Sequence, residues 1–281
     1  MSHETYFEPL LPAEHLKFFG EFTVETIAPC SGLLIKDSFE ELVTAAAEFF
    51  VSAVNSFVKN KGSFIIAISG GATPGPFYKL LAIEPFRSAV PWHRVFVFWV
   101  DERFVSYNHP ESNYGTTKNY LLEHVPIPEN QIYPIPVDIP PEKSAEVYQT
   151  ILMDFFKKRR GELPVFELIS LGVGTDGHIA SIFPDHKSLL VKDRLVVNTK
   201  GKNPDVDRVT LTLPLITAAE KILFIVSGSA KAQIIKKVME GGHMDLPAQK
   251  FLSVKDKVAW ILDRESASLL SNEVLYDEQK R

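Results

Sequence analysis

The sequence contains a single cysteine, Cys30, which excludes any disulfide bond within the chain. Cys30 has neither a partner thiol nor metal-ligand spacing around it, so we interpret it as an inert residue. No pair among the 8 histidines shows the spacing of zinc ligands either. The sequence therefore predicts no metal site.

Signals for export and for membrane insertion are also lacking. The N-terminal residues Met1–Thr5 do not form the charged region followed by an apolar region that begins a secretory signal. No apolar run approaches the roughly 20 residues that are needed to span a bilayer. We therefore expect a cytoplasmic protein with no membrane partner.

Basic charge is scarce as well. The chain has 30 Lys and Arg against 35 Asp and Glu, which gives a formal net charge of -5 at pH 7. This balance argues against a broad basic surface for nucleic acid. An anionic ligand must therefore be held by a few placed cations.

Apolar residues make up 45% of the 281 residues and charged residues 23%, as in ordinary globular proteins. The length is sufficient for a large core. No repeat, low-complexity tract or convincing linker divides the chain. We therefore predict a single domain over residues 1–281.

Short runs of branched apolar residues alternate with helical patterns along the chain. We expect strands at residues 33–35, 64–68, 95–100, near 132, 168–171, 195–197, 208–213, 222–226 and 258–262. We expect helices at residues 38–61, 76–81, 113–122, 144–158 and 263–270, and one that carries Lys231. This alternation predicts an α/β fold, Rossmann-like, with a mostly parallel sheet and helices on both faces.

Four of the expected strands end in polar turns that mostly contain glycine. These turns begin at Ser69, Asp101, Gly172 and Ser227. In an open α/β sheet, ligands bind beyond the carboxyl ends of the strands. The four turns therefore predict one binding site along one edge of the sheet.

The first of these turns, Ser69–Gly71, joins a strand to the start of a helix. Backbone N–H groups there could point at an anion, assisted by the helix dipole. No Gly-Lys-Ser/Thr follows, so a nucleoside triphosphate is not implied. A plain tight turn and a phosphate cradle both fit this segment.

The third turn contains Gly174 within Gly172–Gly177, which matches the pattern G-x-G-x-x-G after a strand. A dinucleotide site would also require an acidic residue at the end of the next strand, which ends instead at Asn198 and Thr199. This disfavours a dinucleotide, and the sequence predicts no cofactor.

His178 directly follows that turn, two residues after Asp176. Histidine changes its protonation near neutral pH, which most residues do not. Its position at the end of a strand makes it the first candidate for a catalytic group. The alternative is a buried histidine that is hydrogen-bonded to a neighbour.

Cations and a carboxylate occur at the other strand ends. Asp101 and Arg103 follow one strand, Arg208 begins another, and Lys231 lies in the first turn of a helix. A cation is unfavourable at that end of a helix unless an anion comes to meet it. Ordinary surface charges are the alternative for all of them.

Several motifs occur in an order that resembles one known family. They are Ser69–Pro74, Asp101–Val105, Ser112–Gly115, Gly172–Pro184, Arg208–Thr212, Gly228–Ala232 and Trp260–Asp263. Over nearly its whole length the chain is similar to the 6-phosphogluconolactonases of the glucosamine-6-phosphate isomerase/6-phosphogluconolactonase family. It departs from the pattern at Ala72, where a second serine is usual, and at Thr175, Ile179 and Ile182.

The resemblance implies a fold similar to that of glucosamine-6-phosphate deaminases. It also implies hydrolysis of 6-phospho-D-glucono-1,5-lactone, with His178 as the base and Asp176 orienting it. The implied binding residues for phosphate and sugar are Ser69, Gly70, Gly71, Asp101, Arg103, Gly174, Arg208 and Lys231. No metal, cofactor, nucleic acid or membrane takes part, and a monomer is expected.

Two rival functions remain open. The segment Asp176–Ala180 fits a glucosamine-6-phosphate deaminase equally well. The deaminase pattern, however, continues into Phe-Asn-Glu-Pro, whereas Ser181–Pro184 has no glutamate. The deaminase pattern also prefers tyrosine at the position of Arg103. A sugar-phosphate-binding regulator would keep the cleft without catalysis. Such regulators commonly carry a DNA-binding segment, and we find no basic helix-turn-helix stretch here.

Overall fold

The computed structural model describes residues 31–71, 74–158, 162–201, 204–242 and 245–274. Cys30 and the N-terminal residues Met1–Thr5 lie outside the described residues, as does Ala72.

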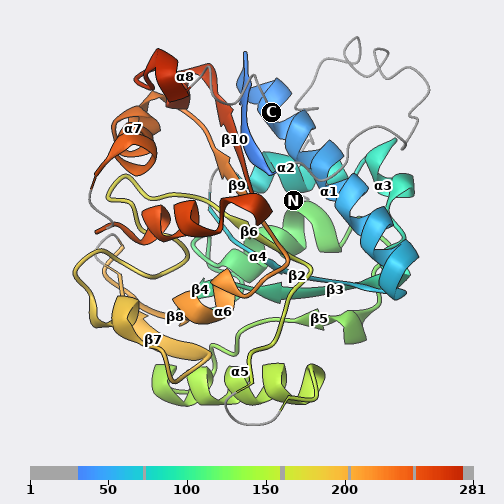
Figure 1. Ribbon diagram of the computed structural model, residues 1–281. Helices are drawn as coiled ribbons and strands as arrows, with labels where there is room; N and C mark the ends of the chain where they lie inside the picture. Colours follow the sequence, from blue (N-terminus) through green and yellow to red (C-terminus); the bar gives the residue numbers. More distant parts are fainter. Residues whose placement is uncertain (1–30, 72–73, 159–161, 202–203, 243–244, 275–281) are drawn as a thin grey trace, which may run out of the picture.

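A seven-stranded sheet forms the centre of the molecule, and every pairing in it is parallel (Figure 1). From one edge to the other its strands are β1 (Gly32–Lys36), β10 (Val258–Asp263), β9 (Lys221–Val226), β6 (Leu168–Leu171), β2 (Phe64–Ile68), β3 (Val95–Trp99) and β5 (Ile132–Tyr133). The inner strands are almost wholly buried, which explains their near-continuous apolar sequences.

The four strands with polar turns at their ends are neighbours, in the order β9, β6, β2, β3. Because these strands are parallel, their carboxyl ends meet at one edge of the sheet. The turns at Ser69, Asp101, Gly172 and Ser227 therefore lie side by side, as the sequence predicts.

A second, antiparallel sheet was not foreseen. Its strands are β4 (Asp101–Arg103), β8 (Asp207–Leu211) and β7 (Val196–Lys200), in that order. Val100 lies between the two sheets, since its N–H donates to Ile68 of β2 and its carbonyl accepts from Leu211 of β8. The expected strand at 95–100 therefore ends at Trp99, and the charged turn after it is itself a strand.

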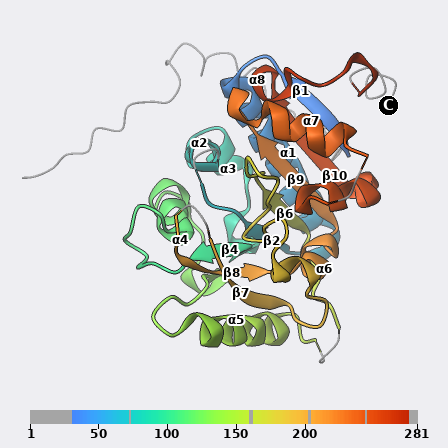
Figure 2. The same cartoon turned by 90° about the vertical axis from the view of Figure 1, so that its left-hand side faces the viewer.

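Helices cover the sheets on several sides. They are α1 (Phe39–Lys61), α2 (Pro74–Leu81), α3 (Phe86–Ala89), α4 (Asn113–Thr117), α5 (Pro141–Phe155), α6 (Leu213–Thr217), α7 (Ala232–Glu240) and α8 (Arg264–Ala267). Figure 2 shows β7 between β8 and α5, so that α5 covers the second sheet.

The longest helix, α1, has the boundaries that the sequence predicts. Its N-cap Ser38 accepts a hydrogen bond from the N–H of Glu41, and Gly62 ends it in the left-handed conformation. Among the described residues it is the one helix that is long and apolar enough to cross a membrane by length and composition. Its buried residues, such as Leu42 and Val54, belong to the main core cluster.

Some helix boundaries differ from the expectation. Helix α5 begins at Pro141 rather than at residue 144, because proline fits the first turn, where no intrahelical N–H bond is needed. The helix expected at 113–122 divides into α4 and a π-helical turn, Lys118–Leu122. Helix α8 is only four residues long, and Asp263 caps it rather than belonging to it.

One buried cluster includes residues of both sheets. Within it, Phe98 of β3 is fully buried and stacks on Tyr133 with ring centroids 4.6 Å apart. Phe98 also meets Phe155 of α5 and Phe166 edge to face. This aromatic group connects strand β3 of the parallel sheet to the helix that covers the second sheet.

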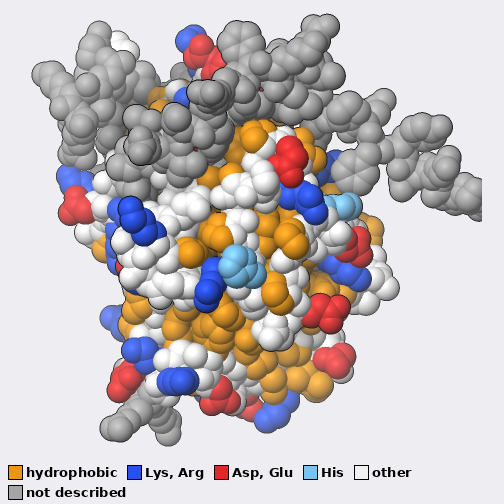
Figure 3. Space-filling view, turned by 90° about the vertical axis from the view of Figure 1, so that its right-hand side faces the viewer, with side chains coloured by type: hydrophobic (Ala, Val, Ile, Leu, Met, Phe, Trp, Pro, Cys, Tyr) orange, Lys and Arg blue, Asp and Glu red, His pale blue; other side chains and the backbone are white. Residues whose placement is uncertain are grey.

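Figure 3 shows the side of the molecule opposite to that of Figure 2. Apolar side chains occupy much of the lower half of this side, with Lys and Arg around them. The large apolar side chains that are exposed among the described residues are Leu34, Ile83, Leu163, Val165, Leu190 and Leu269.

We expect Phe98→Ala to lower the free energy of unfolding by about 3–5 kcal/mol, because it leaves a cavity among closely packed rings. Urea unfolding followed by circular dichroism measures this change. Leu190→Ala is the matched control, because Leu190 is 76% exposed and its loss should change stability by less than about 0.5 kcal/mol. Equal effects of the two substitutions would contradict this account of the core.

Candidate active site

A cavity of about 320 Å³ opens at the edge where the four strand ends meet. This volume suits a small ligand. Nine of the ten residues proposed from the sequence line it: Ser69, Gly70, Gly71, Asp101, Arg103, Gly174, His178, Arg208 and Lys231. The tenth, Asp176, does not line it but is hydrogen-bonded to His178.

The turn after β6 brings His178 back toward the strand that precedes it. The N–H of Gly174 donates to the carbonyl of His178 at 2.8 Å, and the N–H of Gly177 donates to the carbonyl of Gly174 at 2.9 Å. A Cβ atom at position 174 would lie 2.1 Å from Nδ1 of His178. Glycine is therefore required at 174 for the imidazole to take this position.

The imidazole of His178 is held by Asp176. Asp176 Oδ1 lies 2.5 Å from Nδ1 and 3.1 Å from the backbone N of His178. Burial opposes ionisation of this carboxyl, but the hydrogen bonds and charge of His178 outweigh it and lower the pKa of Asp176 to about 2. An ionised carboxylate can only accept a hydrogen bond, so Nδ1 of a neutral ring must carry the proton and donate a hydrogen bond to Asp176. Nε2 then keeps its lone pair.

Two arginines enter the cavity from the second sheet. Arg103 on β4 lies directly opposite Arg208 on β8 in the strand register. Like charges at opposite positions of a sheet repel each other. Burial lowers the pKa of Arg208, and the charge of Asp101 counteracts this. An anion that binds both guanidinium groups would relieve the repulsion.

Lys231 adds a third cation from the turn Ser229–Lys231, which precedes α7. Within the described ranges, no hydrogen bond or ion pair involves its ammonium group. Burial lowers the pKa of Lys231, and the charge of Asp176 partly counteracts this. A half-buried cation beside two arginines suits an anionic ligand.

Two of the proposed residues use their side chains within the protein. Ser69 donates its hydroxyl proton to the carbonyl of Ser170 on β6 at 2.8 Å. Asp101 accepts at one oxygen from Ser181, at 2.6 Å, and at the other from the amide of Asn113, at 3.3 Å. Ser69 and Asp101 therefore contribute to the cavity through their backbone groups and their positions as much as through side-chain contacts.

Three further residues, which were not proposed as site residues from the sequence, contribute to the site. Asn113 and Ser227 line the cavity. Asp263, at the end of β10, accepts from the hydroxyl of Ser227 and from the N–H of Gly228, and so holds the turn before Lys231. Asn113 and Asp263 both occur in the motifs that resemble the family, which was the one signal that pointed to them.

Glu102 secures the segment that carries Arg103 and Asn113. Its buried carboxyl group accepts from the backbone N–H groups of Arg103, Asn113 and Tyr114, at 2.7–2.8 Å. The hydroxyl of Ser112 donates to it as well, at 3.1 Å. Burial raises the pKa of Glu102 to about 7, although the backbone hydrogen bonds lower it.

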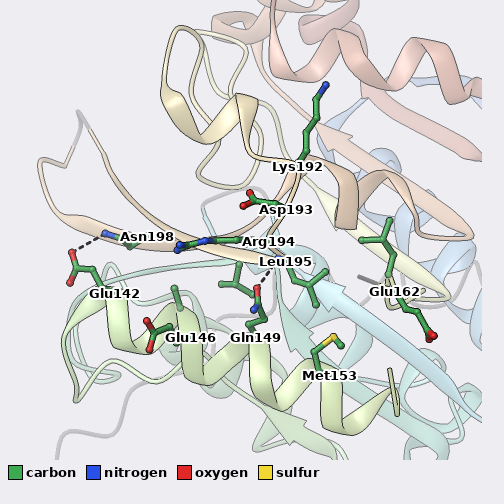
Figure 4. A pocket seen from close by; sticks show the side chains of 13 residues that line it. Glu142, Glu146, Gln149, Met153, Glu162, Lys192, Asp193, Arg194, Leu195 and Asn198 are labelled. Carbon is green, nitrogen blue, oxygen red and sulfur yellow. Dashed lines mark hydrogen bonds between the residues drawn. The ribbon is translucent and has the colours of Figure 1, made fainter. Parts of the chain in front are cut away.

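A larger cavity, of about 540 Å³, lies between α5 and the segment that leads into β7 (Figure 4). It contains none of the residues proposed from the sequence. Two hydrogen bonds cross it, from Asn198 to Glu142 at 3.0 Å and from the N–H of Leu195 to Gln149 at 2.9 Å. Lys192 points away from the other charged groups (Figure 4). We therefore assign the candidate active site to the smaller cavity.

Among the residues that the structure describes, no group of three or more His, Cys, Asp or Glu side chains is arranged to hold a metal ion.

Comparison with known sequences relates the chain to one family. Residues 37–260 match the family described as glucosamine-6-phosphate isomerases/6-phosphogluconolactonase. The chain is 36% identical over 247 residues to the 6-phosphogluconolactonase of Synechocystis sp., a match that covers 87% of this chain and 99% of the relative. It is 35% identical over 252 residues to that of Homo sapiens, with 87% and 96% covered.

Solved structures confirm the fold class. The 6-phosphogluconolactonase of Trypanosoma brucei matches with a TM-score of 0.75 and 27% identity, over 86% of this chain and 99% of that one. A monomeric glucosamine-6-phosphate deaminase matches with a TM-score of 0.71 and 21% identity, over 85% and 99%. The deaminase therefore shares the fold, as the sequence predicts.

We expect Glu102→Ala to lower the free energy of unfolding by about 2–4 kcal/mol, because it leaves buried N–H groups without an acceptor. Chemical denaturation of the two proteins measures the difference. Glu111→Ala, at an exposed position between β4 and α4, is the control and should have little effect. A stability loss no larger than that of the control would contradict the anchoring role.

The lowered pKa of Asp176 predicts a pH-dependent contribution to stability. The native carboxyl group ionises at a lower pH than the unfolded one, so its contribution is present above about pH 4 and is lost as the pH falls toward about 2. We expect wild type to be more stable than Asp176→Asn near neutral pH, with a difference that shrinks in this range. Urea unfolding of both proteins across the range measures it, and a constant difference would refute the prediction.

Proposed function

Because the chain belongs to the glucosamine-6-phosphate isomerase/6-phosphogluconolactonase family, we propose that it hydrolyses 6-phospho-D-glucono-1,5-lactone to 6-phospho-D-gluconate, with His178 as the general base. This reaction is the second step of the oxidative pentose phosphate pathway. The observation that carries the proposal is the His178–Asp176 pair beside a cavity lined by three cations.

Binding begins at the phosphate. Arg103, Arg208 and Lys231 supply positive charge at one cavity, and Gly70 and Gly71 line it as well. A phosphate held there fixes the sugar ring relative to the imidazole. The binding energy of a non-reacting group is in this way used to orient the reacting one.

Hydrolysis then needs one base and no covalent intermediate, because a δ-lactone is an activated ester. Nε2 of His178 takes a proton from water while the water oxygen forms a bond to the lactone carbonyl carbon. The bond from that carbon to the ring oxygen breaks, and the ring oxygen receives the proton from Nε2. Asp176 keeps Nδ1 protonated throughout and stabilises the imidazolium that forms between the two steps.

The negative charge that develops on the carbonyl oxygen also requires donors. Backbone N–H groups of the glycine turns after β2 and β6 are the candidates, because both turns line the cavity. Every group that the reaction uses belongs to one chain, so we propose a monomer that acts on a small molecule. The cytoplasm stays the predicted location.

The deaminase remains the closest rival, since it shares the fold. Two features of this chain favour the lactonase: Arg103 where the deaminase pattern has tyrosine, and Ser181–Pro184 without the deaminase glutamate. Release of ammonia from glucosamine 6-phosphate would decide for the deaminase. Tight binding of a sugar phosphate without turnover of either substrate would decide for a regulator.

We expect His178→Ala to lower kcat by about 10²–10⁴-fold while the protein remains folded, because it removes the base but none of the cations. The measurement is acid release in a pH-stat with freshly made 6-phosphoglucono-δ-lactone, corrected for spontaneous hydrolysis. His93→Ala is the matched control, because His93 is exposed and precedes β3 at the other end of the strand.

The control should retain full activity. Thermal unfolding of His178→Ala shows whether the variant is folded. Near-normal turnover in a folded His178→Ala protein would refute the assignment of the base, and no acid release by wild type would refute the proposed reaction.

A further inference from the structure

The two arginines of the cavity are connected by a chain of buried polar groups, two of which, Asp101 and Asn113, line the cavity. Nη1 of Arg103 donates to Oδ1 of Asn113. The amide nitrogen of Asn113 donates to Asp101, at 2.8 Å to its carbonyl oxygen and 3.3 Å to its carboxylate. The other carboxylate oxygen of Asp101 accepts from Ser181 at 2.6 Å, and Ser181 in turn accepts from Arg208 at 3.5 Å.

The intermediate members of this chain are shielded from water. Asn113 is 1% exposed, Ser181 0% and Asp101 5%. Hydrogen bonds to charged groups are strong in such surroundings, and a missing partner is costly. The arrangement therefore has one preferred geometry, which determines where the two guanidinium groups lie.

We propose that Asn113 is a positioning residue that holds Arg103 in place for the phosphate of the substrate. This inference rests on the proposed function, because it assumes that the phosphate binds at the cations. Asn113 does not need to touch the substrate to act in this way. Its effect passes through the guanidinium group that it holds.

The amide group is what qualifies Asn113 for this role. Its oxygen accepts from a cation and its nitrogen donates to Asp101, so the two ends need different hydrogen-bonding character. An aspartate at 113 would place a second carboxylate against Asp101 and would lose the donor. An apolar residue would leave both neighbours without this partner.

The contacts of Arg103 leave part of its guanidinium group available to a ligand. Nη1 donates to Oδ1 of Asn113 and, at 3.2 Å, to the carbonyl of Glu111. Nε is buried and has no hydrogen-bond partner among the described residues. The second terminal nitrogen, Nη2, makes no hydrogen bond within the described residues, so a guanidinium group that is fixed at Nη1 beside the cavity still has a nitrogen available for an anion.

Asn113 also shapes the glycine turn after β2. A Cβ atom at Gly70 would lie 1.9 Å from Oδ1 of Asn113, so the side chain of Asn113 packs directly against that glycine. One amide therefore contacts both the turn that is expected to face the phosphate and the arginine that is expected to bind it. This double contact distinguishes Asn113 from a residue that only stabilises α4.

The test compares Asn113→Ala with Thr117→Val. Thr117 is fully buried in the same helix and donates to the carbonyl of Asn113 at 2.9 Å, but within the described residues it makes no hydrogen bond to either arginine. Steady-state kinetics are measured with 6-phosphoglucono-δ-lactone and with glucono-δ-lactone, which lacks the phosphate. Inorganic phosphate is tested as a competitive inhibitor.

We expect Asn113→Ala to raise KM for the phosphorylated lactone and the inhibition constant of phosphate by about tenfold each, with a smaller change in kcat. kcat/KM for glucono-δ-lactone should fall much less than kcat/KM for the phosphorylated lactone, because no phosphate is bound. Thr117→Val should match wild type in all of these values. In an Arg103→Met background, Asn113→Ala should add no further increase in KM.

Three outcomes would overturn the inference: an unchanged KM in Asn113→Ala, equal losses with both lactones, or additive effects of the Asn113 and Arg103 substitutions. Asn113→Ser serves as the second variant if Asn113→Ala does not fold. If wild type hydrolyses neither lactone, the proposed function fails by itself. Calorimetric titration of inorganic phosphate into wild type and Asn113→Ala then still tests the role of Asn113.

Discussion

The repulsion between Arg103 and Arg208 is the constraint on which the site depends. Their strands place them opposite each other, and both line a cavity that contains Lys231 as well. Concentrated positive charge in a partly buried place is unfavourable unless anions compensate it. Asp101 supplies one negative charge through its hydrogen-bonded neighbours, and the phosphate of a substrate would supply the rest. A protein with a net negative charge can therefore still attract an anion to one point.

The junction between the two sheets makes this concentration of charge possible. Val100 is bonded to β2 on one side and to β8 on the other, so the chain leaves the parallel sheet and enters the antiparallel one within a single residue. The carboxyl ends of the parallel strands thereby meet the arginines of the second sheet at one cavity. His178 comes from the first sheet and Arg208 from the second. The strands carry Arg103 and Arg208 and anchor the turns that carry His178 and Lys231, so base and cations are held at fixed positions, as orientation of a small substrate requires.

Much of the fold could be predicted from the sequence, because buried parallel strands and long amphipathic helices leave clear patterns. The runs at 64–68 and 222–226 are strands in the structure, and α1 begins and ends at its caps. In the second sheet, β7 and β8 were also predicted as strands, but their pairing and the third strand, β4, left no comparable pattern. Strand β4 has three residues, all charged, and its partner lies about 100 positions away in the chain. Pairing of that kind depends on tertiary contacts rather than on local preference.

By itself, the sequence determined the elements and the chemical groups: which strands are buried, which turns follow them, and which histidine stands beside an aspartate and a glycine turn. Those features are local, because apolar periodicity and turn residues act over a few positions. Only the tertiary structure decided that Arg103 faces Arg208, that Asn113 lies against Gly70 and that Asp263 holds the turn before Lys231. These relations join residues that are distant in the chain, and they exist only where strand register and buried hydrogen bonds bring such residues together.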